Sequence, residues 1–476
     1  VTDRNYTMPE ELVSRHPGRQ GTGYGKLRAN RFIPLVEIQD AKGLHSGYLA
    51  WMTLFSSTTN NNGSMEGSVI GGISAVSNDF YNASGIALVG EVVDAMMLPA
   101  YLTQGGTTEY TYIASDTESV SAGGAYVDLS RVGSTENVVM DIELYRNGES
   151  IKKMDSTVCK LIKQSNDIRQ SFYNYDLSSG TPDHVVVTLK IDGRIVDRIE
   201  HDIVFWSPKA ESDRHYIYKE DGYFKQDGKI INFFGVNYMP SYGVADTATI
   251  PNVGTTFEHY IHSAAYDPEV IHDDLLHIKD MGMNAVSVFI HAQGADSNNM
   301  LDLIRQCDEL GIYVDLSIRS GNSDNRATGD FLYFTKENAE KLIVPQHFSE
   351  VDNIIAYDIC WERAMGSYAA SGDLGRYIYD AQWRQWILDQ YGSVEHAEAL
   401  WGCKAPRNSA GLVVGPDDNT FGNPTDSQAK MIAAYYRFLD DVIADDFNAT
   451  FTYMRQFDNN HLYSFRMSMS GSPSVS

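Results

Sequence analysis

The second half of this chain alternates short apolar runs with longer amphipathic segments. The apolar runs have the length of buried strands, and the longer segments carry apolar residues every three or four positions, as on one helix face. Clusters of Gly, Asn, Asp and Ser separate the two kinds of segment. The pattern predicts strands at 230–238, 283–290, 312–318, 353–361 and 461–467, and helices at 267–282, 299–310, 336–344, 374–391 and 427–457.

Local signals support these boundaries, most clearly at the first predicted helix. Asp267 can cap the helix, Pro268 suits its first position, and Glu269 places an acid in the first turn. Gly282 is typical of a helix end.

Strands that alternate with helices predict a parallel sheet with right-handed crossovers. No Gly-x-Gly-x-x-Gly follows the first strand and no phosphate-binding loop motif occurs, which disfavours a nucleotide-binding open sheet. Long polar loops after the strands and short ones before them favour a (β/α)8 barrel with its site at the carboxyl ends. By residue 476 we count about five strands, so we expect a partial barrel, completed by further sequence or by another chain.

The first two hundred residues predict a different architecture. Short strands are separated by turn residues with no long helical period, and Asp192-Gly193 indicates a type I′ hairpin. We expect a β-rich region at 1–119, an immunoglobulin-like β-sandwich at 120–206, a connector at 207–222 and the partial barrel at 223–476. The predicted strands are 32–39, 47–55, 84–90, 110–114, 138–145, 184–191 and 194–203.

Glu362 is the strongest candidate for chemistry. It directly follows the apolar run 353–361, at the carboxyl end of a predicted barrel strand, where barrel enzymes hold catalytic groups. A glutamate partly sheltered by Trp361 could keep a proton at neutral pH and donate it to a leaving group. An ordinary strand-end salt bridge is the structural alternative.

Several segments resemble clan A glycoside hydrolases, with features of families 42 and 5. The segment 233–240 resembles their first strand, 280–286 the entry to their second, and 308–314 their third. The segment 356–362 resembles the fourth strand, which ends at the general acid/base. The resemblance, which covers about half the chain, implies a retaining β-glycosidase with Glu362 in that role.

Two features depart from this family pattern. Trp361 stands where many members have an asparagine that contacts the sugar 2-hydroxyl. The family nucleophile follows strand seven, which residues 1–476 do not reach, so we expect it beyond this segment. An inverting reaction would instead need a second carboxylate about 6.5–9.5 Å away, for which Asp315 and Asp358 are candidates inside their strands.

Polar and aromatic residues at the other predicted strand ends could bind a sugar. Hydroxyl groups need donors and acceptors, whereas the apolar face of a pyranose stacks on aromatic rings. The predicted substrate-binding residues are Asn237, Tyr238, Tyr242, His291, Arg319, Trp361 and Arg466.

Composition narrows the function further. The formal net charge of −26 disfavours nucleic-acid binding, and no apolar run is long enough to span a bilayer. We predict no cofactor and no metal, a carbohydrate substrate, a possible second chain or homo-oligomer, and a secreted or cell-surface location. A non-catalytic structural or carbohydrate-binding surface protein is the alternative function. Asn-x-Ser/Thr triplets predict glycosylation sites at Asn5, Asn62, Asn82 and Asn448.

Overall fold

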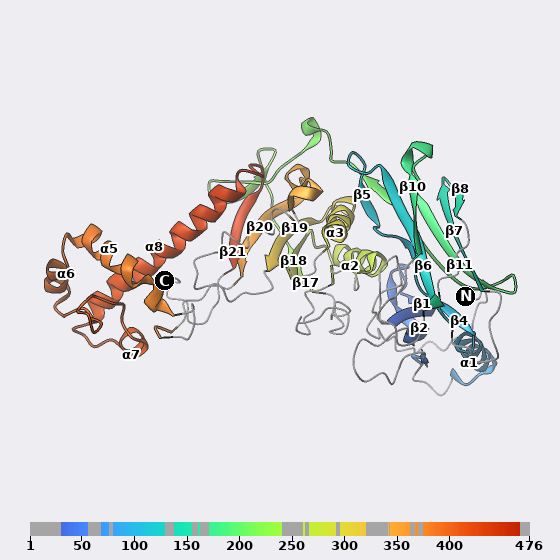
Figure 1. Cartoon of the computed structure of the whole chain (residues 1–476), viewed down its shortest axis with the longest axis horizontal. Helices are drawn as coiled ribbons and strands as arrows, with labels where there is room; N and C mark the ends of the chain where they lie inside the picture. The colour runs from blue at the N-terminus through green and yellow to red at the C-terminus, as the bar shows by residue number, and fades with distance from the viewer. Residues whose placement is uncertain are drawn as a thin grey trace. The chain divides into compact units, whose positions relative to one another are not determined.

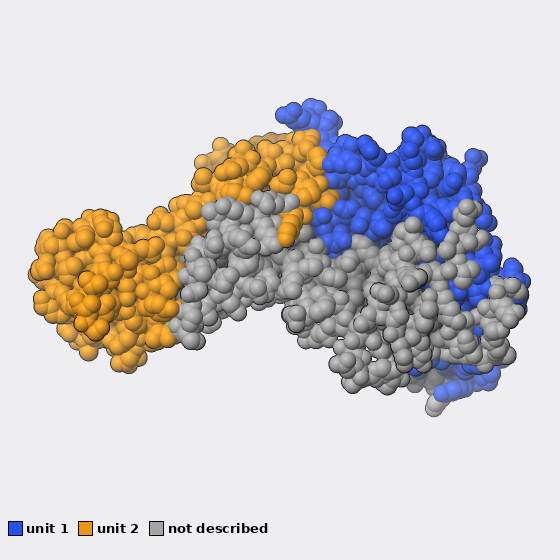
Figure 2. All heavy atoms as spheres, viewed as in Figure 1, with its two compact units in different colours: residues 1–213, 233–314 blue, residues 214–232, 315–476 orange. Residues whose placement is uncertain are grey.

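The computed structural model describes the chain in segments that form two compact units. Unit 1 comprises residues 1–213 and 233–314, and unit 2 comprises 214–232 and 315–476 (Figure 2). At several strand ends, including 289–291, 318–319, 359–361 and 465–466, the description covers the backbone alone. The described residues are 30–55, 68–75, 80–128, 138–154, 160–161, 171–239, 260–261, 266–291, 296–319, 341, 343–361, 367–369 and 375–466.

The first sheet of unit 1 is antiparallel and carries a helix. Its strands are β1 (Asn30–Gln39), β2 (His45–Phe55) and β3 (Val69–Ile73), in that order, and α1 (Ala83–Met96) contacts β2 and β3 (Figure 1). The strands predicted at 32–39 and 47–55 are therefore confirmed. The strand predicted at 84–90 is wrong, because that segment forms half of α1.

Helix α1 forms because a cap and an apolar face act together. The side chain of Asn82 accepts a hydrogen bond from the backbone N–H of Gly85 at 3.0 Å, which satisfies one of the first-turn donors. Gly85, Leu88 and Val92 recur at helical spacing and are buried. A short apolar run with no charge fits either a strand or a helix by pattern, and here the cap and the packing select the helix.

Two four-stranded sheets follow in unit 1. One has the order β12–β11–β7–β8; the other has the order β10–β6–β4, with β9 beside β6. The turn at Asp192-Gly193 has positive φ at both residues, as the predicted type I′ hairpin requires. Apolar side chains from Ala100 to Ile203 form one core cluster that draws on strands of both sheets. The strands are β4 (Ala100–Thr107), β6 (Ser119–Asp128), β7 (Val138–Arg146), β8 (Glu149–Met154), β9 (Lys160–Leu161), β10 (Ser171–Asp176), β11 (His184–Ile191) and β12 (Arg194–Asp202).

A buried aspartate joins this β-rich part to a helix within unit 1. Asp302 of α3 (Ser297–Glu309) is 1% exposed and accepts a hydrogen bond from Thr111 Oγ1 at 2.6 Å. Thr111 begins β5 (Thr111–Ile113), which pairs in parallel with β13 (Val204–Trp206). Arg305 and Gln306 each donate to Asp302 at 2.9 Å, and the hydroxyl of Tyr266 also donates to it. Four donors thus compensate the burial of one carboxylate.

A small antiparallel sheet in unit 2 includes the start of one predicted strand. The strands β14 (Tyr218–Glu220), β15 (Tyr223–Gln226) and β16 (Lys229–Ile230) are joined at Asp221-Gly222 and Asp227-Gly228, where all four residues have positive φ. The predicted strand 230–238 is therefore wrong in extent, because Ile230 belongs to this small sheet. The strand that joins the parallel sheet, β17, begins only at Gly235. The two Asp-Gly pairs were the signal for these hairpins.

The second half contains a five-stranded sheet with the order β17–β18–β19–β20–β21 (Figure 1). The boundary between the two units falls within β19. The later strands and the helices predicted at 267–282 and 299–310 are confirmed, with Asp267 accepting from the N–H groups of Glu269 and Val270. The structure shows no closed barrel within the described residues. The elements are β17 (Gly235–Tyr238), α2 (Pro268–Asp280), β18 (Ala285–His291), β19 (Tyr313–Arg319), β20 (Ile354–Trp361) and β21 (Leu462–Arg466).

Between β20 and β21 unit 2 contains a helical cluster with an aromatic core. Trp383 is 1% exposed and stacks on Trp401 with ring centroids 5.8 Å apart, while Tyr435 meets Trp383 edge-on at 5.1 Å. Of the helices predicted here, 427–457 is confirmed as α8, whereas 374–391 is a short 3-10 turn followed by α5. The helices are α5 (Asp380–Tyr391), α6 (Val394–Trp401), α7 (Asp418–Gly422) and α8 (Ala429–Met454).

Candidate active site

The candidate site in unit 2 lies where β20 and β21 end. The two strands are parallel, and Trp361 is the pairing partner of Arg466 at their carboxyl ends. Between Asp358 and Trp361 the strand β20 contains one more residue than the facing part of β21, which is the pattern of a β-bulge. Bulges of this kind occur at barrel rims and beside active sites, where they redirect side chains. Glu362, the residue that follows Trp361, lies outside the described residues.

In unit 1 the strands β17 and β18 form a second parallel pair. Tyr238 pairs with Val288, and β18 continues to His291. Because parallel strands end at the same edge of a sheet, Tyr238 and His291 lie at the ends of neighbouring strands. Asn237 is exposed and precedes Tyr238. The amide of Asn237 is therefore exposed near this edge, and its predicted contact with a sugar stays a prediction.

Tyr238 itself is engaged in the protein interior. It is 5% exposed, and its hydroxyl donates to Asp274 of α2 at 2.8 Å. Its ring meets that of Tyr260 edge-on, with centroids 5.6 Å apart. Burial raises the pKa of Asp274, although the hydrogen bond from Tyr238 opposes that shift. These contacts give Tyr238 a packing role, and its predicted contact with sugar stays a prediction.

The remaining rim residues can be placed only in part. Arg319 ends β19, Arg466 ends β21, and the described backbone gives no position for their side chains or for those of His291 and Trp361. Tyr242 lies outside the described residues. Their predicted roles in substrate binding are therefore untested.

The two carboxylates considered for an inverting reaction sit within strands. Asp358 is 2% exposed and pairs with Ser464 in the middle of the β20–β21 ladder. Asp315 is the third residue of β19 and is half-buried. Neither lies at a strand end, so neither position offers the open approach that an attacking water needs.

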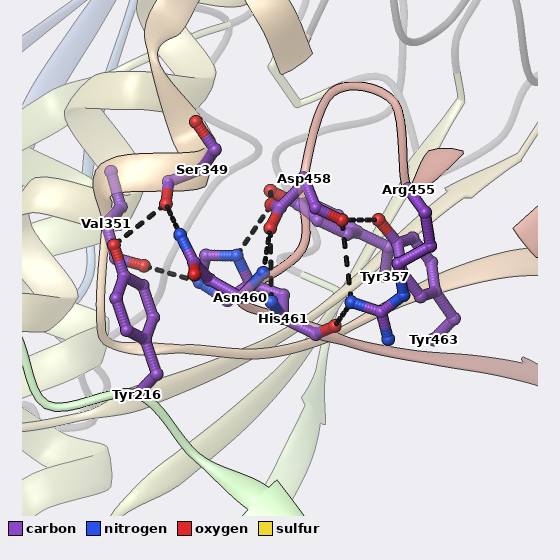
Figure 3. Close-up of polar contacts among 9 residues, drawn as sticks. All are labelled: Tyr216, Ser349, Val351, Tyr357, Arg455, Asp458, Asn460, His461 and Tyr463. Carbon is purple, nitrogen blue, oxygen red and sulfur yellow. Dashed lines mark hydrogen bonds and ion pairs between the residues drawn. The ribbon is translucent and has the colours of Figure 1, made fainter. Parts of the chain in front are cut away.

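Sequence reasoning missed a buried polar cluster at the opposite ends of the unit 2 strands (Figure 3). Asp458 and His461, both fully buried, precede β21, and His461 Nδ1 lies 2.7 Å from Asp458 Oδ2. His461 Nε2 lies 2.7 Å from the carbonyl oxygen of Val351, three residues before β20 begins. The hydroxyl of Tyr357, within β20, donates to the same Asp458 oxygen at 2.8 Å. The only sequence signal was Asp458, three residues before the histidine that begins the predicted strand 461–467.

The cluster extends along both segments that lead into the strands. Arg455 donates to the carbonyl oxygen of His461 at 3.0 Å, and Tyr463 donates to that of Asp458 at 2.6 Å. Asn460 and Tyr216 both donate to the carbonyl oxygen of Ser349, at 3.0 and 2.9 Å (Figure 3). Parallel α/β sheets bind ligands at the carboxyl ends of their strands, whereas this cluster lies at the amino ends. We therefore assign this cluster a structural role.

The electrostatics of the cluster depend on Asp458. Burial alone would raise the pKa of its carboxyl group. The hydrogen bond and charge of His461, with the backbone N–H groups of Asn460 and His461, outweigh burial and lower the pKa to about 2. Burial and the charge of Asp458 together raise the pKa of Tyr357. The cluster thus holds an ionised carboxylate inside the protein.

A cavity of about 860 Å³ in unit 1 lies away from these strand ends. It is bordered by β1, β12, α2 and α3, and its lining includes Glu37, His184, Glu200, His272 and Asp273. None of the lining residues belongs to the predicted sugar-binding set.

The predicted glycosylation sites are described in part. Asn82 and Asn448 are exposed, but Asn82 caps α1 and Asn448 lies within α8, while Asn5 and Asn62 lie outside the described residues. Among the residues whose structure is described, no three His, Cys, Asp or Glu side chains are grouped as a metal site would require. In the same parts of the chain, no helix has the length and apolar character needed to cross a bilayer.

Comparisons with known proteins give weak likenesses only. No protein-family model and no curated protein matches the chain. A Bacteroides fragilis structure assigned as a β-galactosidase is 14% identical, with a TM-score of 0.23 over 56% of this chain and 36% of that one. A Ruminococcus gnavus β-glucuronidase is 10% identical, with a TM-score of 0.22 over 57% of this chain and 39% of that one. Parabacteroides merdae β-glucuronidase is 13% identical, with a TM-score of 0.23 over 71% of this chain and 39% of that one.

This chain spans well under half the length of those solved structures. All three are β-glycosidases or are assigned as such. TM-scores near 0.2 are too low to indicate a function for this chain.

Proposed function

We propose that this chain carries part of the active site of a retaining glycoside hydrolase that acts on β-linked glycosides. The observation that supports the proposal is the end of β20, where a bulged parallel strand paired with Arg466 leads directly into Glu362. Barrel-type enzymes hold their catalytic groups at this position. In the proposal Glu362 is the general acid/base.

The chemistry requires a second carboxylate. In a retaining glycosidase one carboxylate attacks the anomeric carbon while the other protonates the departing oxygen, and the two lie about 5–5.5 Å apart. Glu362 then takes a proton from the water that releases the sugar. We propose that the nucleophile is a residue outside 1–476.

Neighbouring residues have supporting roles in this proposal. A guanidinium near Glu362, such as that of Arg466, would tune its proton affinity. Trp361 would stack on a sugar face, and Asn237, His291 and Arg319 would bind hydroxyl groups.

The test compares the full-length natural protein with its Glu362→Gln variant on aryl β-glycosides. Proton donation matters for poor leaving groups, so kcat/KM should fall by about 10²–10⁴-fold for phenyl glycosides and far less for dinitrophenyl glycosides. The kcat for dinitrophenyl glycosides should fall as well, because water must then attack the glycosyl intermediate without a general base. Added azide should restore turnover of the activated substrate, because it needs no general base.

Glu395→Gln provides the matched control, since Glu395 is exposed on α6. An equal loss of kcat/KM for phenyl and dinitrophenyl glycosides, or full activity of the Glu362 variant, would refute the acid/base assignment. A wild-type protein inactive on every β-linked glycoside would favour the non-catalytic, carbohydrate-binding alternative.

A further inference from the structure

The cavity of about 860 Å³ in unit 1 has a strongly acidic lining. Its described lining residues include seven carboxylates but a single guanidinium group, that of Arg305. Strands contribute Glu37, Glu200 and Asp202, and helices contribute Glu269, Asp273, Asp302 and Glu309. Small-molecule sites have volumes of about 300–1,000 Å³. The cavity therefore has the size of a ligand site and a charge that attracts cations.

The positive side chains described around the cavity do not balance these carboxylates. Besides Arg305 there is Arg198, which is not in the described lining but pairs with Glu200. Seven carboxylates against two guanidinium groups leave an excess of five negative charges. Burial lowers the pKa of His201 to about 4, so this lining histidine adds no charge at neutral pH. The carboxylates stay in excess even when the other two lining histidines and the neighbouring His45 are protonated.

Two buried polar atoms on one wall indicate what a ligand must offer. One face of α3 lines the cavity with residues three or four positions apart, namely Asp302, Arg305, Gln306 and Glu309. Gln306 is 4% exposed, and its Nε2 donates to Asp302 at 2.9 Å and to the carbonyl oxygen of Pro268 at 3.3 Å. Its Oε1 accepts no hydrogen bond from any described residue, and Nε of Arg305 likewise has no acceptor among them.

These two atoms call for a ligand with both donors and an acceptor. A buried polar atom without a partner destabilises the fold, and a ligand that donates to Gln306 and accepts from Arg305 removes that cost. A protonated polyamine offers N–H donors but no acceptor. A metal ion needs several ligands at one point, and within the described ranges no three His, Cys, Asp or Glu side chains are grouped in that way.

An amino sugar meets both requirements. Its ammonium groups donate to carboxylates, and its hydroxyl groups both donate and accept. Pro34, Leu35 and Val204 also line the cavity and suit the C–H faces of a sugar ring. A carboxylate has about four lone-pair sites, so an ion pair within the protein leaves acceptor capacity for a ligand.

We propose that this cavity binds a cationic amino-sugar oligosaccharide. Its ammonium groups lie against the carboxylates, one of its donors serves Oε1 of Gln306, and one of its hydroxyl groups accepts from Nε of Arg305. The inference does not depend on the proposed glycosidase activity, because none of the residues assigned to that reaction is among the described residues that line the cavity.

The test is isothermal titration calorimetry of the full chain with two trisaccharides. One is the trimer of glucosamine, at a mildly acidic pH at which its amino groups are protonated, and the other is the trimer of N-acetylglucosamine. The acetylated trimer has the same sugar rings but no charge. The glucosamine trimer should bind once per chain, and the acetylated trimer at least about tenfold more weakly. Added salt should weaken binding of the charged trimer.

Variants locate the binding site in the cavity. Glu200→Gln with Asp273→Asn should weaken binding of the glucosamine trimer by about tenfold or more, because one carboxylate on each side of the cavity is lost. Gln306→Met, which keeps the length of the side chain, should weaken it by about threefold. The matched control is Glu118→Gln with Glu149→Gln, which removes the same charge at exposed positions of unit 1 outside the described lining. It should change the affinity by less than about twofold. Melting curves check that every variant folds.

Four results would overturn the proposal. Equal binding of the two trimers would show that the ammonium groups are not recognised. Unchanged affinity in the folded Glu200/Asp273 variant would remove the site from the cavity. An equal loss in that variant and in the control would trace binding to the overall negative charge. Binding of spermidine as tight as that of the glucosamine trimer would contradict the role of the hydroxyl groups.

Discussion

Replacing Asp458 by asparagine tests the buried cluster of unit 2. The carboxylate accepts hydrogen bonds from the hydroxyl of Tyr357, from His461 Nδ1 and from the backbone N–H groups of Asn460 and His461. Asparagine has nearly the same shape but no charge, and one of its two terminal atoms donates instead of accepting. The ring of His461 or the hydroxyl of Tyr357 must therefore change its hydrogen bonding to match the amide.

The pKa of Asp458 gives the size of the effect. That pKa is about 2, against an ordinary value of 3.8. One pKa unit corresponds to about 1.4 kcal/mol, so ionisation of Asp458 stabilises the fold by about 2 kcal/mol at neutral pH. Because the folded pKa is the lower one, this contribution is complete above about pH 5 and is lost as the pH falls through 3.8 towards 2. About half of it should remain at about pH 3.

Urea unfolding followed by tryptophan fluorescence measures this contribution. Of the 6 tryptophans in the chain, Trp361, Trp383, Trp386 and Trp401 belong to unit 2, so the signal reports mainly on the unit that contains Asp458. Asp458→Asn should lower the free energy of unfolding by about 2 kcal/mol at neutral pH, and by about 1 kcal/mol at about pH 3.

Asp445→Asn is the control for this experiment, because Asp445 is exposed on α8 and should cost little at either pH. If the difference between wild type and Asp458→Asn is the same at both pH values, the ionised carboxylate is not the source of the stability. A loss below about 0.5 kcal/mol at neutral pH would refute the reasoning altogether.

Three further substitutions test unit 1, each by urea or thermal unfolding followed by circular dichroism. Asp302→Ala should lower the free energy of unfolding by about 3–5 kcal/mol, because it removes the acceptor that Thr111, Tyr266, Arg305 and Gln306 share, and a loss below about 1 kcal/mol would contradict the network. Gly106→Ala should lower the free energy of unfolding by about 3 kcal/mol or more. Gly106 has φ +124, and an added Cβ would lie 2.3 Å from Nε2 of His201. An unchanged free energy of unfolding would contradict this packing. Asn82→Ala should cost about 1 kcal/mol through loss of the α1 cap, and Asn82→Asp should restore most of it.

Predictions made from the sequence succeeded where neighbouring residues carry the signal. Asp267 and Pro268 fix the start of α2 through the orphan N–H groups of the first turn, an interaction within one segment. Asp192-Gly193 fixes the β11–β12 hairpin in the same way, because both positions need positive φ. The apolar runs that end at Trp361 and Arg466 likewise identified strands whose pairing partners were not needed to recognise them.

Predictions failed where distant segments decide the structure. The apolar run at 84–90 fits a strand or a helix, and the packing of Leu88 and Val92 on a sheet, together with the Asn82 cap, selects the helix. The run at 230–238 is divided by one local and one distant pairing. Lys229–Ile230 pairs with β15 across the turn at Asp227-Gly228, whereas Gly235–Tyr238 pairs with β18, about fifty residues away in the sequence. In each case the local pattern leaves two structures close in free energy.

The amino-acid sequence by itself therefore determined the alternation of strands and helices in the second half, the cap of α2 at Asp267, and the position of Glu362 directly after an apolar strand. Only the tertiary structure decided which strands pair, that Tyr238 turns to Asp274, and that Asp458 and His461 meet the carbonyl of Val351. The physical reason is separation along the chain. Caps and turns are stabilised by contacts within a few residues, but the buried Asp458–His461 pair is completed by Tyr357 and by the carbonyl oxygen of Val351, which folding brings from about a hundred residues away.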